Sequence, residues 1–99
     1  MSAYIIARVA IRDREAYQPY LDRTPGVVAK YGGRFVVRGG ALETLEGPAE
    51  TRRVVVLAFD DMAAARRFYE SADYQAIVPL RQAASEGQLI LVEGVAGQP

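Results

Sequence analysis

Short apolar or alternating segments predict β-strands at four places along the chain. Residues 3–11 alternate with the two-residue period of a half-buried strand, and their apolar side is formed by Ile5, Ala7, Val9 and Ile11. Residues 53–59 form a nearly unbroken apolar run rich in valine, which is typical of a central strand. The other two strands are expected over residues 34–39 and 88–95.

The predicted second strand separates aromatic from basic side chains. Strict alternation places Phe35 on the side opposite Arg34 and Arg38. The segment then reaches Gly39-Gly40, where we expect a bulge or a turn, and it is expected to end near the loop signal Gly47-Pro48.

Capping residues and helical spacing predict a first helical block between the first two strands. Asp13 is placed as an N-cap. Pro19 falls inside the expected span, so we expect a bend or a short first helix. Thr24-Pro25 resembles a fresh cap with proline at the first helical position, so the helix is expected to restart there and to stop at Gly32-Gly33.

A second helical block is expected after the third strand. Asp60-Asp61 is placed to cap a helix whose apolar residues recur at three- and four-residue spacing. Ser71 is expected to cap a further helix over Asp73–Ser85, kinked or delayed by Pro79. We expect Gly87 to end that helix.

The predicted order of elements is strand, helix, strand, strand, helix pair, strand, which is the ferredoxin-like split βαβ arrangement, βαββαβ. We expect one α+β domain over residues 1–96, with a four-stranded antiparallel sheet, both helical blocks on one face, and a loose tail over 97–99. The other face of the sheet still carries Tyr4 and Ile6. Because a chain this small buries only somewhat over ~60 % of its surface, we expect a second copy to cover that face, giving a homodimer through the sheet faces.

The composition excludes several kinds of chemistry. The chain has neither cysteine nor histidine, so it lacks thiolate nucleophiles and the commonest metal ligand and general base. We expect no metal and no cofactor. Twelve basic and twelve acidic residues cancel to zero net charge, which argues against nucleic acid as a partner. Neither a signal-peptide pattern nor a run of ~18 apolar residues occurs, so we expect no membrane partner and a cytoplasmic location.

Arginines supply the first candidate site residues. Guanidinium groups bind carboxylate or phosphate through paired hydrogen bonds, so an anion site can be formed by Arg34, Arg38, Arg53 and Arg81. The alternative is that these strand-end arginines pair with carboxylates such as Glu43, Glu46 or Glu50, or remain solvated. Arg8 lies on the side of the first strand that a partner would cover, which favours an interface ion pair.

Two tyrosines and one glutamate complete the candidates. Tyr69 and Tyr74 can orient a substrate, ahead of Tyr17 and Tyr20, although buried tyrosines more often pack and hydrogen-bond their hydroxyl groups. Glu46 is the best candidate base, against the interpretation of its Glu-Gly-Pro context as a plain turn.

Short motifs spread from Tyr4 to Val95 resemble those of a known family. They are Tyr31-Gly32-Gly33-Arg34, Val37-Arg38-Gly39-Gly40, Glu46-Gly47, Arg53-Val54-Val55-Val56 with Phe59, Ala65, Tyr69-Glu70-Ser71, Tyr74-Gln75 and Arg81. In this order and spacing the chain resembles the domain of unknown function 1330 family. The resemblance implies a fold of the dimeric α+β barrel superfamily and no established activity. That superfamily includes cofactor-free oxygenases, isomerases and haem-handling proteins, so fold alone does not select an activity.

Three hypotheses for function follow. The first is a homodimeric protein that binds a small anionic or aromatic metabolite between sheet and helices. The second is a cofactor-free isomerase, lyase or oxygenase in which the protein orients the substrate and supplies electrostatics. The third is a purely structural dimerising module. No catalytic motif decides between an enzyme and a binding protein.

Overall fold

The computed structural model describes residues 2–96 and confirms the predicted order of elements. The elements are β1 (Ala3–Ile11), α1 (Arg14–Lys30), β2 (Arg34–Arg38), β3 (Arg53–Phe59), α2 (Met62–Glu70), α3 (Ala72–Ala84) and β4 (Ser85–Glu93). The strands form one antiparallel four-stranded sheet in the order β2-β3-β1-β4, so β3 is central as predicted. This is the ferredoxin-like α+β arrangement. The tail predicted over 97–99 lies outside the described residues.

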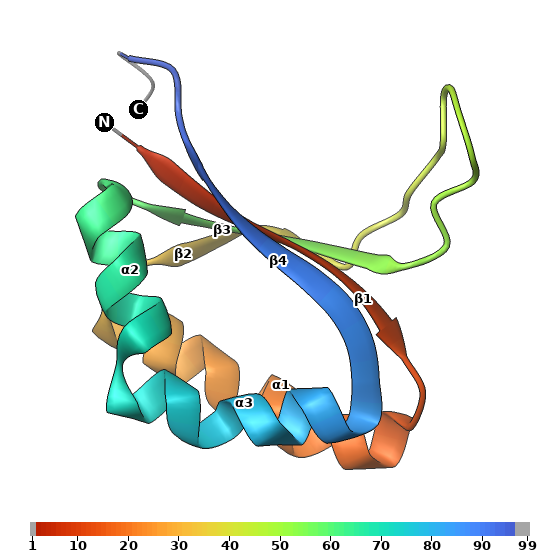
Figure 1. Ribbon diagram of the computed structural model, residues 1–99, viewed down its shortest axis with the longest axis horizontal. Coiled ribbons are helices and arrows are strands. Elements are labelled where there is room, and N and C mark those ends of the chain that lie inside the picture. Colours follow the sequence, from red (N-terminus) through yellow and green to blue (C-terminus); the bar gives the residue numbers. More distant parts are fainter. Residues whose placement is uncertain (1, 97–99) are drawn as a thin grey trace.

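The three helices lie on one face of the sheet, which we call the inner face (Figure 1). β1 turns its predicted apolar side toward them, and Ile5 and Val9 are 4 % and 2 % exposed. Aromatic side chains fill the layer between sheet and helices, with the Phe68 ring centre 5.2 Å from that of Phe59 and 4.5 Å from that of Tyr74. Burying each large apolar side chain contributes about 1.5–3 kcal/mol, and this burial holds the helices on the sheet.

The break predicted in the first helical block is absent. α1 is continuous through Pro19 and Pro25. A proline inside a helix removes one backbone hydrogen bond, but here the helix buries an apolar face that includes Tyr20 and Val28, and this packing offsets the loss. Thr24, expected as a new N-cap, instead donates its hydroxyl hydrogen bond to the Tyr20 carbonyl one turn earlier.

Three side chains cap the helices at the predicted N-cap positions. Each accepts a hydrogen bond from a backbone N–H in the first turn: Asp13 from Ala16 at 3.1 Å, Asp61 from Ala64 at 2.7 Å and Ser71 from Tyr74 at 3.0 Å. α3 starts one residue earlier than predicted and continues through Pro79.

The last strand begins earlier than expected. β4 follows α3 directly at Ser85, so Gly87 lies inside a strand and does not end the helix as predicted. A Cβ atom at position 87 would lie 2.6 Å from the Arg8 carbonyl oxygen of β1. Glycine is therefore required by the close approach of the two strands.

A β-bulge in β2 reverses the side predicted for Arg38. Phe35 and Val37 pair with consecutive residues of β3, so Val36 is the extra residue. After the bulge Arg38 lies on the inner face together with Phe35. Strict alternation predicted the opposite face because it placed the irregularity later, at Gly39-Gly40.

The other face of the sheet, which we call the outer face, has no helix over it among residues 2–96 (Figure 1). One apolar row crosses the strands of this face, and its cross-strand neighbours are Val37, Val56, Ile6 and Ile90. Val37 and Ile90 are each 38 % exposed. The chain by itself leaves this row open to solvent.

β2 ends at Arg38, before the predicted end near Gly47-Pro48, and residues 39–52 connect it to β3. Residues 40–52 of this connection form a long excursion that we call the arm. It rises from the sheet on the side away from the helices (Figure 1). Within residues 2–96 no helix has the length and apolar character needed to cross a membrane.

Candidate functional site

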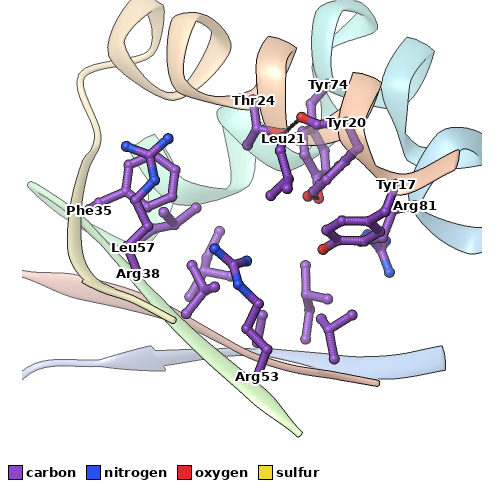
Figure 2. Close-up of a pocket in the computed structure, with 15 residues that line it drawn as sticks. Tyr17, Tyr20, Leu21, Thr24, Phe35, Arg38, Arg53, Leu57, Tyr74 and Arg81 are labelled. Atoms are coloured by element: carbon purple, nitrogen blue, oxygen red, sulfur yellow. Dashed lines mark hydrogen bonds between the residues drawn. The ribbon is translucent and has the colours of Figure 1, made fainter. Parts of the chain in front are cut away.

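A cavity lies between the inner face of the sheet and the helices α1 and α3 (Figure 2). It contains ≈ 530 Å³ of unfilled space, including its open mouth. Its floor is apolar and is formed by Ile5, Ala7, Val9, Val55, Leu57 and Leu89. Its walls are formed by Tyr17, Tyr20, Leu21, Thr24, Phe35, Arg38, Arg53, Tyr74 and Arg81. An apolar space with a few convergent polar groups is the usual form of a small-molecule site.

Arg81 of α3 is the buried cation of this cavity. Its side chain belongs to a residue that is only 8 % exposed, and its Cζ atom lies 6.0 Å from the centre of the Tyr20 ring. Burial lowers the pKa of the Arg81 guanidinium, but Tyr74 and Tyr20 beside it raise that pKa by more, so the group stays charged. Its Nε atom is buried without a hydrogen-bond partner. Leaving such a donor unpaired costs about 1–3 kcal/mol.

Arg38 and Arg53 reach the cavity from the adjacent strands β2 and β3. The Arg38 Cζ atom lies 4.3 Å from the centre of the Phe35 ring, a cation–π contact that fixes the side chain. Gly39 has a φ of 68°, and a Cβ atom there would lie 2.6 Å from the Arg53 Nε atom. Glycine therefore leaves room for Arg53 to pass. Figure 2 shows both guanidinium groups directed from the sheet toward the helices.

Burial keeps the hydroxyl groups of Tyr17 and Tyr20 protonated at neutral pH. The hydroxyl groups of Tyr20 and Tyr74 share a hydrogen bond of 2.7 Å. Burial raises the pKa of Tyr20, and the neighbouring Tyr74 raises it further. Burial also raises the pKa of Tyr17, although Arg53 and Arg81 partly oppose that shift. These phenols can orient a ligand by hydrogen bonds, but they are poor bases.

The cavity is lined by cations without a carboxylate. The ion pairs of the described chain lie elsewhere: Arg8 with Glu50, Arg12 with Glu86, Lys30 with Asp73, and Arg52 with Glu50. Pairing with glutamate, the alternative interpretation of the strand-end arginines, therefore does not occur at Arg38, Arg53 or Arg81. The lining can hold an anion with an apolar body, but it offers neither carboxylate nor imidazole to accept a proton.

Arginine and tyrosine candidates named from the sequence meet in this cavity. Arg38, Tyr74 and Arg81 all contribute to its wall. Arg34 does not, because its register with β3 places it on the outer face.

The remaining two candidates lie apart from the cavity. Tyr69 lines a separate depression between α2 and β4, although its ring centre is 5.6 Å from that of Tyr74. Glu46 is exposed on the arm. Among residues 2–96, no three acidic, histidine or cysteine side chains gather in a way that could hold a metal ion.

The cavity is also lined by Tyr17 and Tyr20, which the sequence placed behind Tyr69 and Tyr74 as candidates, and by Thr24, which was expected to be an N-cap. All three line the cavity from α1, and their spacing of three and four residues places them on one helical face. That signal was present in the sequence, but a helix broken near Pro19 and restarted at Thr24 would not have had this continuous face.

Solved structures of the same fold are similar to almost the whole chain. A protein of unknown function from Rhodopseudomonas palustris shares 24 % identity at a TM-score of 0.78, over 99 % of this chain and 84 % of that chain. SnoaB, a cofactor-independent oxygenase from Streptomyces nogalater, shares 16 % identity at a TM-score of 0.71, over 99 % and 97 %. A dimeric protein of unknown function with a ferredoxin-like fold from Bacteroides fragilis shares 13 % identity at a TM-score of 0.57, over 94 % and 96 %. At these identities the likeness shows the fold alone.

Comparison of the sequence itself identifies the family. No curated protein matches the chain. The family described as Domain of unknown function (DUF1330) matches residues 2–95. The match covers β1 through β4 and includes all the cavity residues. The chain therefore belongs to the DUF1330 family, as its motifs indicated.

Proposed function

We propose that this protein binds a small anion with an apolar body, such as an aromatic carboxylate, in the cavity between sheet and helices. The observation that carries the proposal is the wall of the cavity, which includes Arg38, Arg53 and Arg81 and no carboxylate. Such a wall favours negative charge, and the apolar floor favours a hydrocarbon body. The unfilled space is limited and partly open at its mouth, which restricts the occupant to a small molecule.

The arginines are expected to contribute most of the selectivity for charge. A hydrogen bond between a charged donor and acceptor contributes about 1.5–3 kcal/mol. Loss of one guanidinium should therefore weaken binding of a carboxylate by roughly ten- to a hundredfold. Binding of a neutral molecule of the same shape should hardly change.

Benzoate and benzyl alcohol form a matched pair of probes for this proposal. We expect benzoate to shift the amide NMR signals of cavity residues and to bind more tightly than benzyl alcohol. Arg53→Gln and Arg38→Gln should weaken benzoate binding. Arg23→Gln is the matched control, because Arg23 lies on α1 beside Thr24 but is exposed to solvent.

Two results would contradict the proposal. Equal affinities for benzoate and benzyl alcohol would show that the cavity does not select an anion. Benzoate shifts confined to residues outside the cavity, with Arg53→Gln binding as the unmodified protein does, would show that the site is wrong.

A second candidate function is oxygenation of a bound substrate anion by dioxygen without a cofactor. It is supported by the structural likeness to SnoaB together with the cationic cavity. Because the lining offers no carboxylate or imidazole, such a substrate would have to enter already ionised. Incorporation of labelled oxygen from dioxygen into an ionised hydroquinone, above autoxidation and lost in Arg53→Gln, would favour this function over simple binding.

We also propose that two copies of the chain associate through their outer faces. The open apolar row from Val37 to Ile90 supports this, as does the dimeric state named for the similar protein from Bacteroides fragilis. Val56→Lys would place a charge in the middle of that row. Sedimentation velocity should then show a dimer for the unmodified protein and a folded monomer for the variant, and a monomeric unmodified protein at micromolar concentration would refute the proposal.

A further inference from the structure

The arm, residues 40–52, is the least covered part of the described chain. Residues 40–49 are exposed throughout, and they include two leucines. Leu42 is 47 % exposed and Leu45 is 88 % exposed. Apolar side chains held this far from the body of a protein commonly mark a surface that another molecule covers.

Hydrogen bonds give the arm a defined direction. The Glu50 backbone N–H donates to the Thr44 hydroxyl oxygen at 2.8 Å, and Gly47 makes the turn between them with a φ of 84°. At the base, Arg52 donates from Nε to the Glu50 carboxylate at 2.9 Å. The same carboxylate lies 3.6 Å from Nε of Arg8, which is on the outer face. The base of the arm is thus tied to the outer face, and the arm rises on that side (Figure 1).

The area of the outer face explains why a second copy would need the arm. With strands ~4.8 Å apart and residues ~3.3 Å apart, four strands over the rows from Val54 to Ala58 outline roughly 300 Å². A stable interface of standard size buries about 800 Å² on each partner. The sheet faces alone fall short of this area, and the arm is the exposed segment beside them.

Charge adds a second reason to pair the arm with an outer face. The arm carries Glu43 and Glu46 in its outer half. Arg34 lies on the outer face, at the end away from the base of the arm, and makes no ion pair with another of residues 2–96. A second copy turned end over end by a two-fold axis across the strands would bring its arm to this arginine.

We propose that the arm of each copy lies across the outer face of the other copy, with Leu42 and Leu45 on the apolar row and the arm's glutamates toward the partner's Arg34. This exchange of arms rests on the outer-face association proposed above and adds the segment that completes the interface. In this arrangement a second copy of the chain covers the two exposed leucines of the arm.

The absence of cysteine makes a direct test possible. Leu45→Cys would carry the chain's single thiol, to which a photoreactive benzophenone maleimide can be attached. A mixture of isotope-labelled and unlabelled protein then distinguishes crosslinks between copies from crosslinks within one copy. We expect crosslinks between copies that map to outer-face residues. Glu15→Cys, exposed on α1, is the control and should give none to the outer face.

Crosslinks from position 45 that stay within one copy, or that reach the helices of the other copy, would overturn the proposal. Sedimentation separates this failure from failure of the dimer itself, because a dimer without arm crosslinks refutes only the arm exchange. In a second measurement, Leu45→Ser should raise the dimer dissociation constant about tenfold or more. Ala63→Ser, on the exposed side of α2, is the control and should leave the dimer dissociation constant as it is in the unmodified protein. If Leu45→Ser also leaves the dissociation constant unchanged, the proposal is overturned.

Discussion

The hydrogen bond between the Tyr20 and Tyr74 hydroxyl groups should contribute measurably to the free energy of unfolding. Both residues are buried, and the bond is 2.7 Å long. Tyr20→Phe should lower the free energy of unfolding by about 1–3 kcal/mol, because the Tyr74 hydroxyl is left buried without this partner. Urea denaturation measures this loss.

A double-mutant cycle provides the control for that measurement. Tyr20→Phe combined with Tyr74→Phe should cost less than the sum of the two single changes, because the second removes the unpaired hydroxyl. Additive losses would show that the two hydroxyls do not stabilise each other.

At the residue scale, the sequence predicted the residue types that line the cavity better than the position of each one. Arginine and tyrosine were the expected ligand-binding types, and Arg38, Tyr74 and Arg81 do meet in one cavity. Arg34 is separated from Arg38 by the bulge at Val36. A bulge is a property of how two strands pair, so the sequence of β2 alone does not reveal it.

At the scale of elements, one ion pair joins the end of α1 to the start of α3. Lys30 Nζ lies 2.7 Å from Asp73 Oδ2, and the Tyr31 hydroxyl donates to the same oxygen at 2.9 Å. The Lys30 hydrogen bond, then that of Tyr31, lowers the pKa of Asp73 below its ordinary 3.8. The hydrogen bond with Asp73 raises the pKa of Lys30 above its ordinary 10.5.

These two shifts predict the pH range over which the pair stabilises the fold. The stabilisation of the fold by ionised Asp73 is present above pH ~3.8 and is lost as the pH falls through the lowered pKa of Asp73. The stabilisation by charged Lys30 is present below pH ~10.5 and is lost as the pH rises through the raised pKa of Lys30. Lys30→Met should therefore be less stable than the unmodified protein at neutral pH, with the difference shrinking in acid and in high salt. Denaturation across pH measures it, and a difference that persists at pH 2 would contradict it.

The bulge in β2 allows a test of how Arg38 reaches the cavity. Deleting Val36 restores regular alternation, which leaves Val37 outside and Arg38 inside. Benzoate binding should therefore survive this deletion. Inserting one alanine between Val37 and Arg38 should turn Arg38 to the outer face and weaken benzoate binding as Arg38→Gln does, and equal binding by both variants would contradict this register.

The bounds of helices and strands were predicted well where the local sequence determines them and poorly where tertiary packing determines them. The bounds of β1 and β3 and the caps Asp13, Asp61 and Ser71 match the structure. The break expected in α1 is wrong because tertiary packing carries a helix through prolines that would weaken it in isolation.

At the scale of the whole molecule, the order of elements was enough to predict the ferredoxin-like fold. What the sequence did not show was how its arginines divide between the two faces, since that depends on the pairing register. The register also explains why Arg53 lines the cavity while its neighbour Val54 lies on the outer face opposite Arg8.

Association of two copies makes thermal stability depend on concentration. If folded copies pair, the melting temperature should rise as protein concentration increases, because mass action favours the associated folded state. Val56→Lys should melt lower and at a temperature independent of concentration. Scanning calorimetry over a hundredfold range of concentration measures this, and identical curves for the unmodified protein would contradict it.

The alternation of β1, β3 and β4 divides their residues between two faces, the cavity lining and the outer face. Odd positions such as Ile5, Val55 and Leu89 line the cavity, while even positions such as Ile6 and Val56 lie on the outer face. In β2 the extra residue exchanges this parity partway along the strand. Substitutions at odd and even positions can therefore accumulate independently over generations, so a lineage can change the lining of the cavity while its outer face is inherited unaltered.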